Sequence, residues 1–349
     1  MVMRRLTRVL AIDGFIISLA LVTIFVFFSL DSQYFFAGEN VRNLLVQSLF
    51  VLVLSLGMTF VLISGGIDLS VGAVLGLSGG TTLLALQHGA PMPVALLAGF
   101  ATGTLVGIAN GFAITKLAIS DFIVTLATLS ITAGLLQVLT SHEQLIGVNS
   151  TSFAFIGNGQ VFKSFFPVPF PVLLVACVIV LLEFVLHRTS FGRSVFAIGI
   201  NRRAAHLAGM RETQIRFGVY VLSGALAAFG GILLSSRLNS VQPGLGGGYE
   251  LTAIASAVLG GTSILGGRGS IWRSAVGALF LGTLANGLQL VGVDPVWNTI
   301  ITGTSIAVAV ALDQGVQRLA LQYLSHAQFE APSGSGNVPL LLLGQEVSE

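Results

Sequence analysis

The chain has 349 residues, of which 54% are hydrophobic and 9% are charged, and it carries a formal net charge of +2. A water-exposed surface usually requires more charge than this, so the composition excludes an ordinary soluble protein and predicts an all-α polytopic membrane protein. The excess of basic residues does not predict a nucleic-acid partner, because membrane topology explains where those residues fall.

About ten apolar segments are predicted to form transmembrane helices. They are residues 10–30, 41–63, 69–86, 94–115, 122–139, 168–186, 217–235, 251–265, 275–291 and 296–312. Of the 16 Lys and Arg residues, all except Arg42, Lys163 and Arg237 fall on one side of this arrangement. Because Lys and Arg near membrane segments resist translocation, that side is predicted to be cytoplasmic, and both termini are predicted to lie there.

A helix break is predicted where the second segment meets the third. Gly65 and Gly66 stand together there, and adjacent glycines interrupt a helix readily. Asp68 or Ser70 can cap the helix that follows. The alternative for Asp68 is a role in gating or ion coupling, because carboxylates inside membrane proteins are often functional. Gly65, Gly66, Asp68 and Ser70 are therefore candidates for a gate.

Glycine recurs at every fourth position in two of the predicted helices. The third segment carries Gly72, Gly76 and Gly80, and the fourth carries Gly99, Gly103, Gly107 and Gly111. Glycines at this spacing form a flat groove in which another helix can pack. Close helix packing is therefore predicted along both segments.

The most basic part of the chain is the loop 187–216, which links the sixth and seventh segments. It contains Arg188, Arg193, Arg202, Arg203, Arg211 and Arg216. Its centre predicts a short helix, because Asn201 can cap the first free N–H groups and Gly209 suits the left-handed position after a helix. A short capped helix outside the membrane is a docking element, although a solvated positive loop has a similar composition. The docking candidates are Arg202, Arg203, Ala204, Ala205 and Gly209.

A short repeated sequence motif predicts that the chain consists of two related halves. Ala109-Asn110-Gly111 recurs as Ala285-Asn286-Gly287, near the ends of the fourth and ninth segments. These segments run in opposite directions in the ten-helix arrangement, which predicts an inverted repeat of two five-helix halves. Asn110 and Asn286 are candidates for a polar transport pathway, and hydrogen bonding between helices is the alternative explanation of each amide.

The remaining residues favour transport over catalysis. No phosphate-binding G-x-x-x-x-G-K-[ST] motif is present and the five histidines are scattered, so neither ATP hydrolysis, a metal site nor a cofactor is predicted. Glu183 with His187 and Arg188 at one-turn spacing predicts an ion pair at a helix end. Residues 313–349 are predicted to be a disordered cytoplasmic tail that follows a membrane domain of residues 1–312.

Four segments, in order and spacing, resemble the permease subunits of ribose-type monosaccharide ABC importers, the binding-protein-dependent transport inner-membrane component family. They read GMTFVLISGGIDLSVG from residue 57, DFIVTLATLSI from residue 121, TSFGRSVFAIGINRRAAHLAGM from residue 189 and YELTAIASAVLGGTSILGGRGS from residue 249. The similarity covers about residues 41–312. The sequence departs from the usual pattern at Ile200, Thr252, Trp272 and Arg273, so the resemblance does not define the shape of the cytoplasmic surface.

The resemblance implies a bacterial inner-membrane permease that imports a sugar or a similar small neutral solute by alternating access. Besides membrane lipids, it implies three protein partners: a second permease subunit, identical or different, a cytoplasmic ATP-binding subunit, and a periplasmic or lipid-anchored sugar-binding protein. The helix around residues 202–209 is then the contact with the ATP-binding subunit. Two other classes fit the composition, namely an ion-coupled secondary transporter and a membrane scaffold without a pore.

Overall fold

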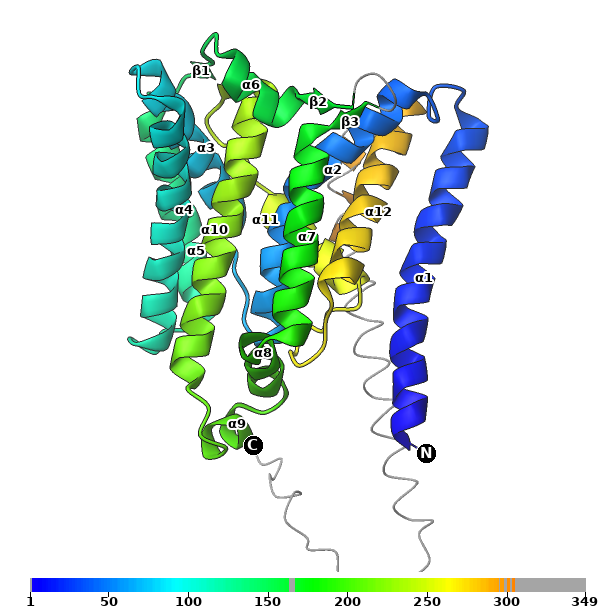
Figure 1. The fold of residues 1–349 in the computed structure, drawn as a ribbon, viewed down its shortest axis with the longest axis vertical. Coiled ribbons are helices and arrows are strands. Elements are labelled where there is room, and N and C mark those ends of the chain that lie inside the picture. Colours follow the sequence, from blue (N-terminus) through cyan, green and yellow to red (C-terminus); the bar gives the residue numbers. More distant parts are fainter. Residues whose placement is uncertain (1, 163–166, 295, 298–299, 302, 305–349) are drawn as a thin grey trace, which may run out of the picture. The chain divides into compact units, whose positions relative to one another are not determined.

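The computed structural model describes residues 2–162, 167–294, 296–297, 300–301 and 303–304 (Figure 1). Contacts within the chain divide it into two units, Met1–Val310 and Ala311–Glu349, and the described residues all belong to the first. The predicted tail, 313–349, lies outside the described residues, and so does most of the tenth predicted span, 296–312.

The described part of the chain is mostly helical, as its composition predicts. Its helices are α1 (Val2–Asp31), α2 (Gly38–Ile63), α3 (Val71–Gln87), α4 (Met92–Thr115), α5 (Asp121–Leu139), α6 (Thr151–Asn158), α7 (Phe170–Arg188), α8 (Ser190–Ile200), α9 (Arg202–Leu207), α10 (Glu212–Leu238), α11 (Tyr249–Leu259) and α12 (Ile271–Leu290). The short strands β1 (Leu145–Ile146), β2 (Gln160–Val161), β3 (Val168–Pro169) and β4 (Ser240–Val241) pair antiparallel, β1 with β4 and β2 with β3. Among the described residues, α2, α4, α5, α7 and α10 are long and apolar enough to cross a membrane. The chain is therefore an all-α membrane protein.

The first nine predicted segments correspond to α1 to α5, α7 and α10 to α12, with ends displaced by up to eight residues, the largest difference being at the start of α1. Two helices, α6 and α8, lie where the sequence interpretation expected loop, and on this point it was wrong. The physical reason is local capping. The Ser150 hydroxyl accepts the N–H of Phe153 at the start of α6, and the Thr189 hydroxyl accepts the N–H of Gly192 at the start of α8.

Helices α2 and α10 form the centre of the bundle. In the most apolar stretch of each, 89% of α2 and 67% of α10 is buried inside the protein, against 22% of α4 and 17% of α5. A helix that is apolar on all sides is typical of such a central position, because its whole surface meets protein or lipid. The outer helices leave large apolar side chains exposed, as a lipid-facing surface requires.

The groove predicted along α4 is confirmed, and α10 fills it. A Cβ added at Gly103 would lie 2.6 Å from the carbonyl oxygen of Gly224, and one at Gly107 would lie 2.5 Å from that of Tyr220. The two backbones therefore approach more closely than any side chain at these positions would allow.

The groove predicted along α3 is also present, and it holds both a helix and a non-helical segment. Leu136 of α5 (Asp121–Leu139) lies against Gly76 and Gly80, where an added Cβ would be 2.9 Å from its side chain. A Cβ at Gly76 would overlap the carbonyl oxygen of Leu245, which belongs to the segment between β4 and α11. That segment contains Pro243, and Gly244, Gly246 and Gly248 have positive φ angles of 82°, 87° and 86°. These residues oppose a helix, so the chain passes α3 in a non-helical form and α11 begins only at Tyr249.

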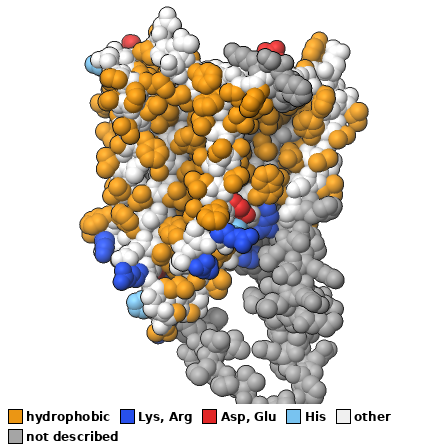
Figure 2. All heavy atoms as spheres, viewed as in Figure 1, with side chains coloured by type: hydrophobic (Ala, Val, Ile, Leu, Met, Phe, Trp, Pro, Cys, Tyr) orange, Lys and Arg blue, Asp and Glu red, His pale blue; other side chains and the backbone are white. Residues whose placement is uncertain are grey.

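The basic residues gather at one end of the bundle. Figure 1 places the start of α1 together with α8 and α9 at this end, and α6 with the short strands at the other end. Figure 2 shows blue Lys and Arg side chains near α8 and α9. We call this the basic end, and it includes Arg188, Arg193, Arg202 and Arg203.

Candidate coupling helix and gate

The short helix predicted in the basic loop is α9, and both of its predicted ends are confirmed. Asn201 Oδ1 accepts the N–H of Ala204 at 2.9 Å. Gly209 has a φ of 78°, its N–H reaches the carbonyl of His206 at 2.9 Å, and Met210 N–H reaches that of Ala205 at 3.1 Å. These two bonds form a Schellman motif, which stops the helix and fixes the direction in which the chain leaves it.

The surface of α9 is suited to contact with another molecule. Leu207 is 81% exposed and Ile200, just before the helix, is 73% exposed. Arg202, Arg203, Ala204 and Gly209 are exposed too, whereas Ala205 is only 5% exposed and packs inward. Of the five predicted docking residues, four are thus accessible, and Ala205 instead holds the helix against the protein.

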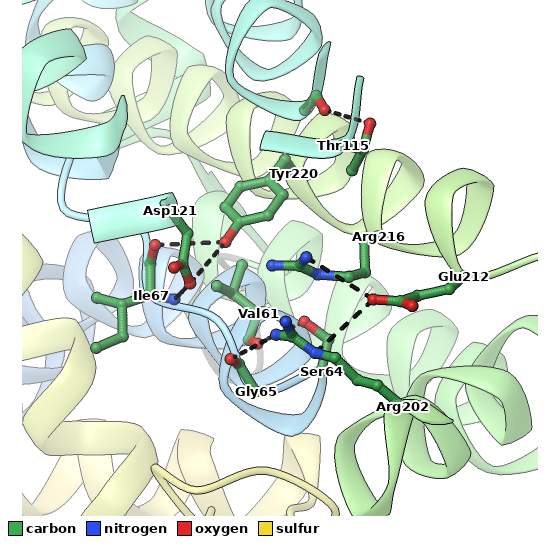
Figure 3. A network of polar contacts seen from close by, with 11 residues as sticks. Val61, Ser64, Gly65, Ile67, Thr115, Asp121, Arg202, Glu212, Arg216 and Tyr220 are labelled. Atoms are coloured by element: carbon green, nitrogen blue, oxygen red, sulfur yellow. Dashed lines mark hydrogen bonds and ion pairs between the residues drawn. The ribbon is translucent and has the colours of Figure 1, made fainter. Parts of the chain in front are cut away.

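Arg202 joins α9 to the predicted helix break. Its Nη2 donates to the carbonyl oxygen of Gly65 at 3.1 Å, and its Nε lies 3.8 Å from Glu212 Oε1 (Figure 3). The same Glu212 oxygen lies 3.9 Å from Arg216 Nη1, so one carboxylate on α10 is shared by two guanidinium groups. The sequence predicted a docking helix and a helix break separately, and the structure brings the two together.

The break after α2 is confirmed. Gly65 has a φ of 74°, its N–H bonds to the carbonyl of Leu62 at 2.8 Å, and Gly66 N–H bonds to that of Val61 at 3.0 Å. A Cβ at Gly66 would lie 2.5 Å from the hydroxyl oxygen of Tyr220. Glycine is therefore required at Gly65 by conformation and at Gly66 by space.

The predicted capping of α3 by Asp68 or Ser70 needs correction. Ser70 occupies the N-cap position, but its side chain makes no capping bond to the helix. Asp68, which is 1% exposed, accepts the Ser70 N–H at 3.0 Å and the Ser70 hydroxyl at 2.6 Å through Oδ1. Its Oδ2 accepts the hydroxyl of Ser223 on α10 at 2.8 Å. Because both oxygens are needed for these bonds, Asp68 tightens the turn and ties it to α10 instead of capping α3.

A chain of buried polar groups continues from this turn across α4 to α5. The amide nitrogen of Asn110 donates to the Ser70 hydroxyl at 3.0 Å, and Thr128 donates its hydroxyl to Asn110 Oδ1 at 2.6 Å. Asn286, on α12, makes a reciprocal amide pair with Asn40, at 3.0 and 3.1 Å. Both candidate pathway amides are therefore hydrogen-bonded between helices, which is the alternative that the sequence left open, and their place on a pathway stays a prediction.

Two carboxylates matter more than the sequence interpretation expected. Asp121 Oδ2 accepts the N–H of Ile67 at 2.9 Å and the hydroxyl of Tyr220 at 3.4 Å, which closes the turn from the side of α5 (Figure 3). Glu183 contacts His187 at 3.3 Å, as predicted, but its Oε2 also accepts the N–H groups of Ile271 and Trp272 at 3.1 and 3.3 Å. Glu183 therefore caps α12, where the helix dipole favours negative charge. The sequence signal for Asp121 was its position, as an acidic residue immediately before a predicted helix.

The described residues thus form an all-α membrane protein in which the exposed helix α9 is bonded to the turn after α2. The chain belongs to the family described as branched-chain amino acid transport system / permease component, which matches residues 40–310. It is a multi-pass permease subunit of the inner membrane.

Individual members of this family are similar over most of the chain. The ribose import permease protein of Bacillus subtilis (strain 168) is 39% identical, over 85% of this chain and 91% of that protein. The D-allose transport system permease protein of Escherichia coli (strain K12) is 33% identical, over 84% and 89%. The xylose transport system permease protein of Haemophilus influenzae (strain ATCC 51907 / DSM 11121 / KW20 / Rd) is 34% identical, over 86% and 95%. Similarity of this extent covers the helix α9 and the α2–α3 turn alike.

Proposed function

We propose that this chain is the permease of an ATP-driven ABC importer and that it carries a monosaccharide. The observation that carries the proposal is the bond between Arg202 on α9 and the carbonyl of Gly65, because it connects an exposed helix directly to a buried turn. The similarity to ribose, D-allose and xylose permeases supports a pentose or hexose as the solute. A sugar also suits a protein whose buried polar groups are mainly hydroxyls and amides.

In this mechanism an ATP-binding subunit docks on α9 and moves it during its own nucleotide cycle. Arg202, Arg203, Ala204 and Gly209 would form the contact surface, and Ala205 would anchor the helix. Movement of Arg202 pulls on the Gly65 carbonyl, and so on the turn that holds Asp68 and Ser70. The turn then alternates between two positions that open the pathway to opposite sides. ATP hydrolysis is supplied by the partner chain.

The other partners follow from the direction of transport. A second permease subunit, identical or different, would complete the pathway, within a shell of membrane lipids. A periplasmic or lipid-anchored sugar-binding protein would deliver the solute to the end that carries α6. The basic end would face the cytoplasm together with both termini, because basic residues are retained on that side.

We infer ten membrane passages arranged as an inverted repeat in which α2 corresponds to α10, α3 to α11 and α4 to α12. Packing between helices supports this correspondence, because two pairs of contacts match: α2 packs on α12 as α10 packs on α4, and α3 packs on α10 as α11 packs on α2. Helices α2 and α10 run in opposite directions, as an inverted repeat requires (Figure 1). The domain boundary near residue 312, with a cytoplasmic tail beyond it, belongs to the same proposal.

Orientation can be tested by cysteine labelling in a Cys177→Ser background. A cysteine at Asn149, which is exposed near α6, is expected to react with an impermeant thiol reagent in intact cells. A cysteine at Arg203, exposed on α9, is expected to react only after the cells are permeabilised. Labelling of position 203 from outside would refute the orientation.

The function is tested by sugar uptake into liposomes that contain the chain, its ATP-binding subunit and a sugar-loaded binding protein. We expect uptake that requires ATP inside and the binding protein outside. Competition among ribose, allose and xylose should then identify the preferred sugar. A complete complex that hydrolyses ATP but accumulates none of these sugars would argue against a monosaccharide importer.

A further inference from the structure

A cavity lies between the start of α2 and the start of α7, at the end of the bundle opposite the basic end (Figure 1). Its volume is about 470 Å³, within the range of about 300–1,000 Å³ that is typical of small-molecule sites. A single water molecule occupies only about 30 Å³, so the space is sufficient for an organic ligand. The coupling pathway through α9 and the turn after α2 does not use this cavity.

The wall of the cavity is polar in one part and apolar in another. Its lining includes two charged and four apolar side chains, those of Glu39, Arg42, Val41, Leu45, Val168 and Val172. Leu45 stands about one helical turn farther along α2 than Arg42, and Val172 stands on the first turn of α7. A ligand that matches this wall is an amphiphile, with its charged part near the end of α2 and its apolar part deeper in the bundle.

The surroundings of the cavity place it at the surface of the membrane. Helices α2 and α7 are both long and apolar enough to cross a membrane, and the cavity lies at their first turns. In the most apolar stretch of α7 only 22% is buried inside the protein, so this helix faces lipid. Tyr34, just before α2, is 64% exposed, and tyrosine is typical of the headgroup level. A membrane lipid is therefore the amphiphile that can reach the cavity directly.

The two charged side chains indicate which headgroup fits. Arg42 Nη2 lies 3.8 Å from Glu39 Oε1, and the exposed fractions of the two side chains are 36% and 80%. An ion pair this long and this exposed contributes little by itself, so both groups can bind a ligand. A headgroup with a phosphate and a primary ammonium is complementary to them. The phosphate can accept hydrogen bonds from Arg42, and the ammonium can donate to Glu39.

We propose that this cavity binds a phospholipid whose headgroup carries a primary ammonium, as phosphatidylethanolamine does. Its phosphate lies against Arg42, its ammonium against Glu39, and the first part of an acyl chain against Leu45 and Val172. The lipid thereby joins the first turns of α2 and α7. Phosphatidylglycerol has no cation for Glu39, and the quaternary ammonium of phosphatidylcholine has no N–H to donate, so both bind more weakly.

Native mass spectrometry of the purified full chain in detergent tests the site, with the three lipids titrated in forms that share the same acyl chains. We expect one phosphatidylethanolamine molecule to bind about tenfold more tightly than either of the other lipids. Glu39→Gln should remove this preference, and Arg42→Gln should weaken the binding of all three lipids about tenfold. Val172→Phe should prevent binding, because the larger side chain fills the cavity.

Two variants serve as matched controls. Val180→Phe makes the same change about two turns further along α7, at a residue that is 70% exposed. Arg237→Gln removes another arginine from the same end of the bundle, one that donates to the side chains of Asn158 and Asn43. Both should keep the preference for phosphatidylethanolamine. Equal affinity for the three lipids, a preference that survives Glu39→Gln and Arg42→Gln, or displacement of the lipid by inorganic phosphate would overturn the proposal.

Discussion

Gly199→Ala is expected to abolish transport and to lower the stability of the folded protein. Gly199 lies in α8, and a Cβ there would overlap the carbonyl oxygen of Ile63 and lie 2.6 Å from the backbone nitrogen of Gly267. The Gly267 N–H donates to the same Ile63 carbonyl at 2.9 Å. These neighbours are backbone atoms, which cannot rotate away. The free energy of unfolding should therefore fall by about 3 kcal/mol or more. Thermal unfolding in detergent and uptake in liposomes measure the two effects.

The matched control is Gly134→Ala. Gly134 is also helical, in α5, but a Cβ there would meet nothing within 4 Å. Alanine favours a helix over glycine by about 0.5–1 kcal/mol, so this variant should be as stable as the unmodified protein or slightly more stable. If both alanine variants lose stability and uptake to the same extent, the close packing of α8 on the end of α2 is not the cause of that loss.

Gly209→Val is expected to reduce uptake about tenfold while the ATP-binding subunit continues to hydrolyse ATP. Gly209 has a left-handed φ of 78°, which costs a residue with a Cβ about 1–2 kcal/mol. Since nothing lies within 4 Å of the added Cβ, the effect comes from conformation and not from collision. The chain after α9 should change direction and the docking surface should be misplaced. A destabilisation of the docked arrangement by about 1.4 kcal/mol corresponds to the tenfold reduction in uptake.

Gly209→Asn is the control for that variant, because asparagine adopts the left-handed conformation more readily than valine. It should retain most of the uptake, and the ratio of sugar transported to ATP hydrolysed should stay near that of the unmodified complex. Equal and mild effects of valine and asparagine would instead indicate a solvated loop that takes no part in coupling.

Local signals in the sequence were sufficient to predict several parts of the site. Asn201 and Gly209 define α9 through capping, and Gly65 with Gly66 defines the break after α2, because these features depend on a few adjacent residues. The glycine spacing of α4 predicted a packing groove for the same reason.

What the sequence could not predict depends on contacts between distant segments. Arg202 and Gly65 are 137 residues apart, and nothing in either neighbourhood indicates the other. Glu183 looked like half of a local ion pair, but its second oxygen caps α12, a helix 88 residues further along the chain. The groove of α3 holds α5, as predicted, but its glycines do not reveal a second occupant. Pro243 and the glycines after it keep that segment non-helical.

The energy source is the most direct test of the account. The chain alone, and the chain with its ATP-binding subunit and binding protein, should be placed in matched liposomes and supplied with either a proton or sodium gradient or with ATP. We predict that the lone chain accumulates no sugar under any gradient and that the complex accumulates sugar with ATP even when ionophores dissipate the gradients. Gradient-driven accumulation by the lone chain, lost in Asp68→Asn, would contradict the account and identify an ion-coupled secondary transporter.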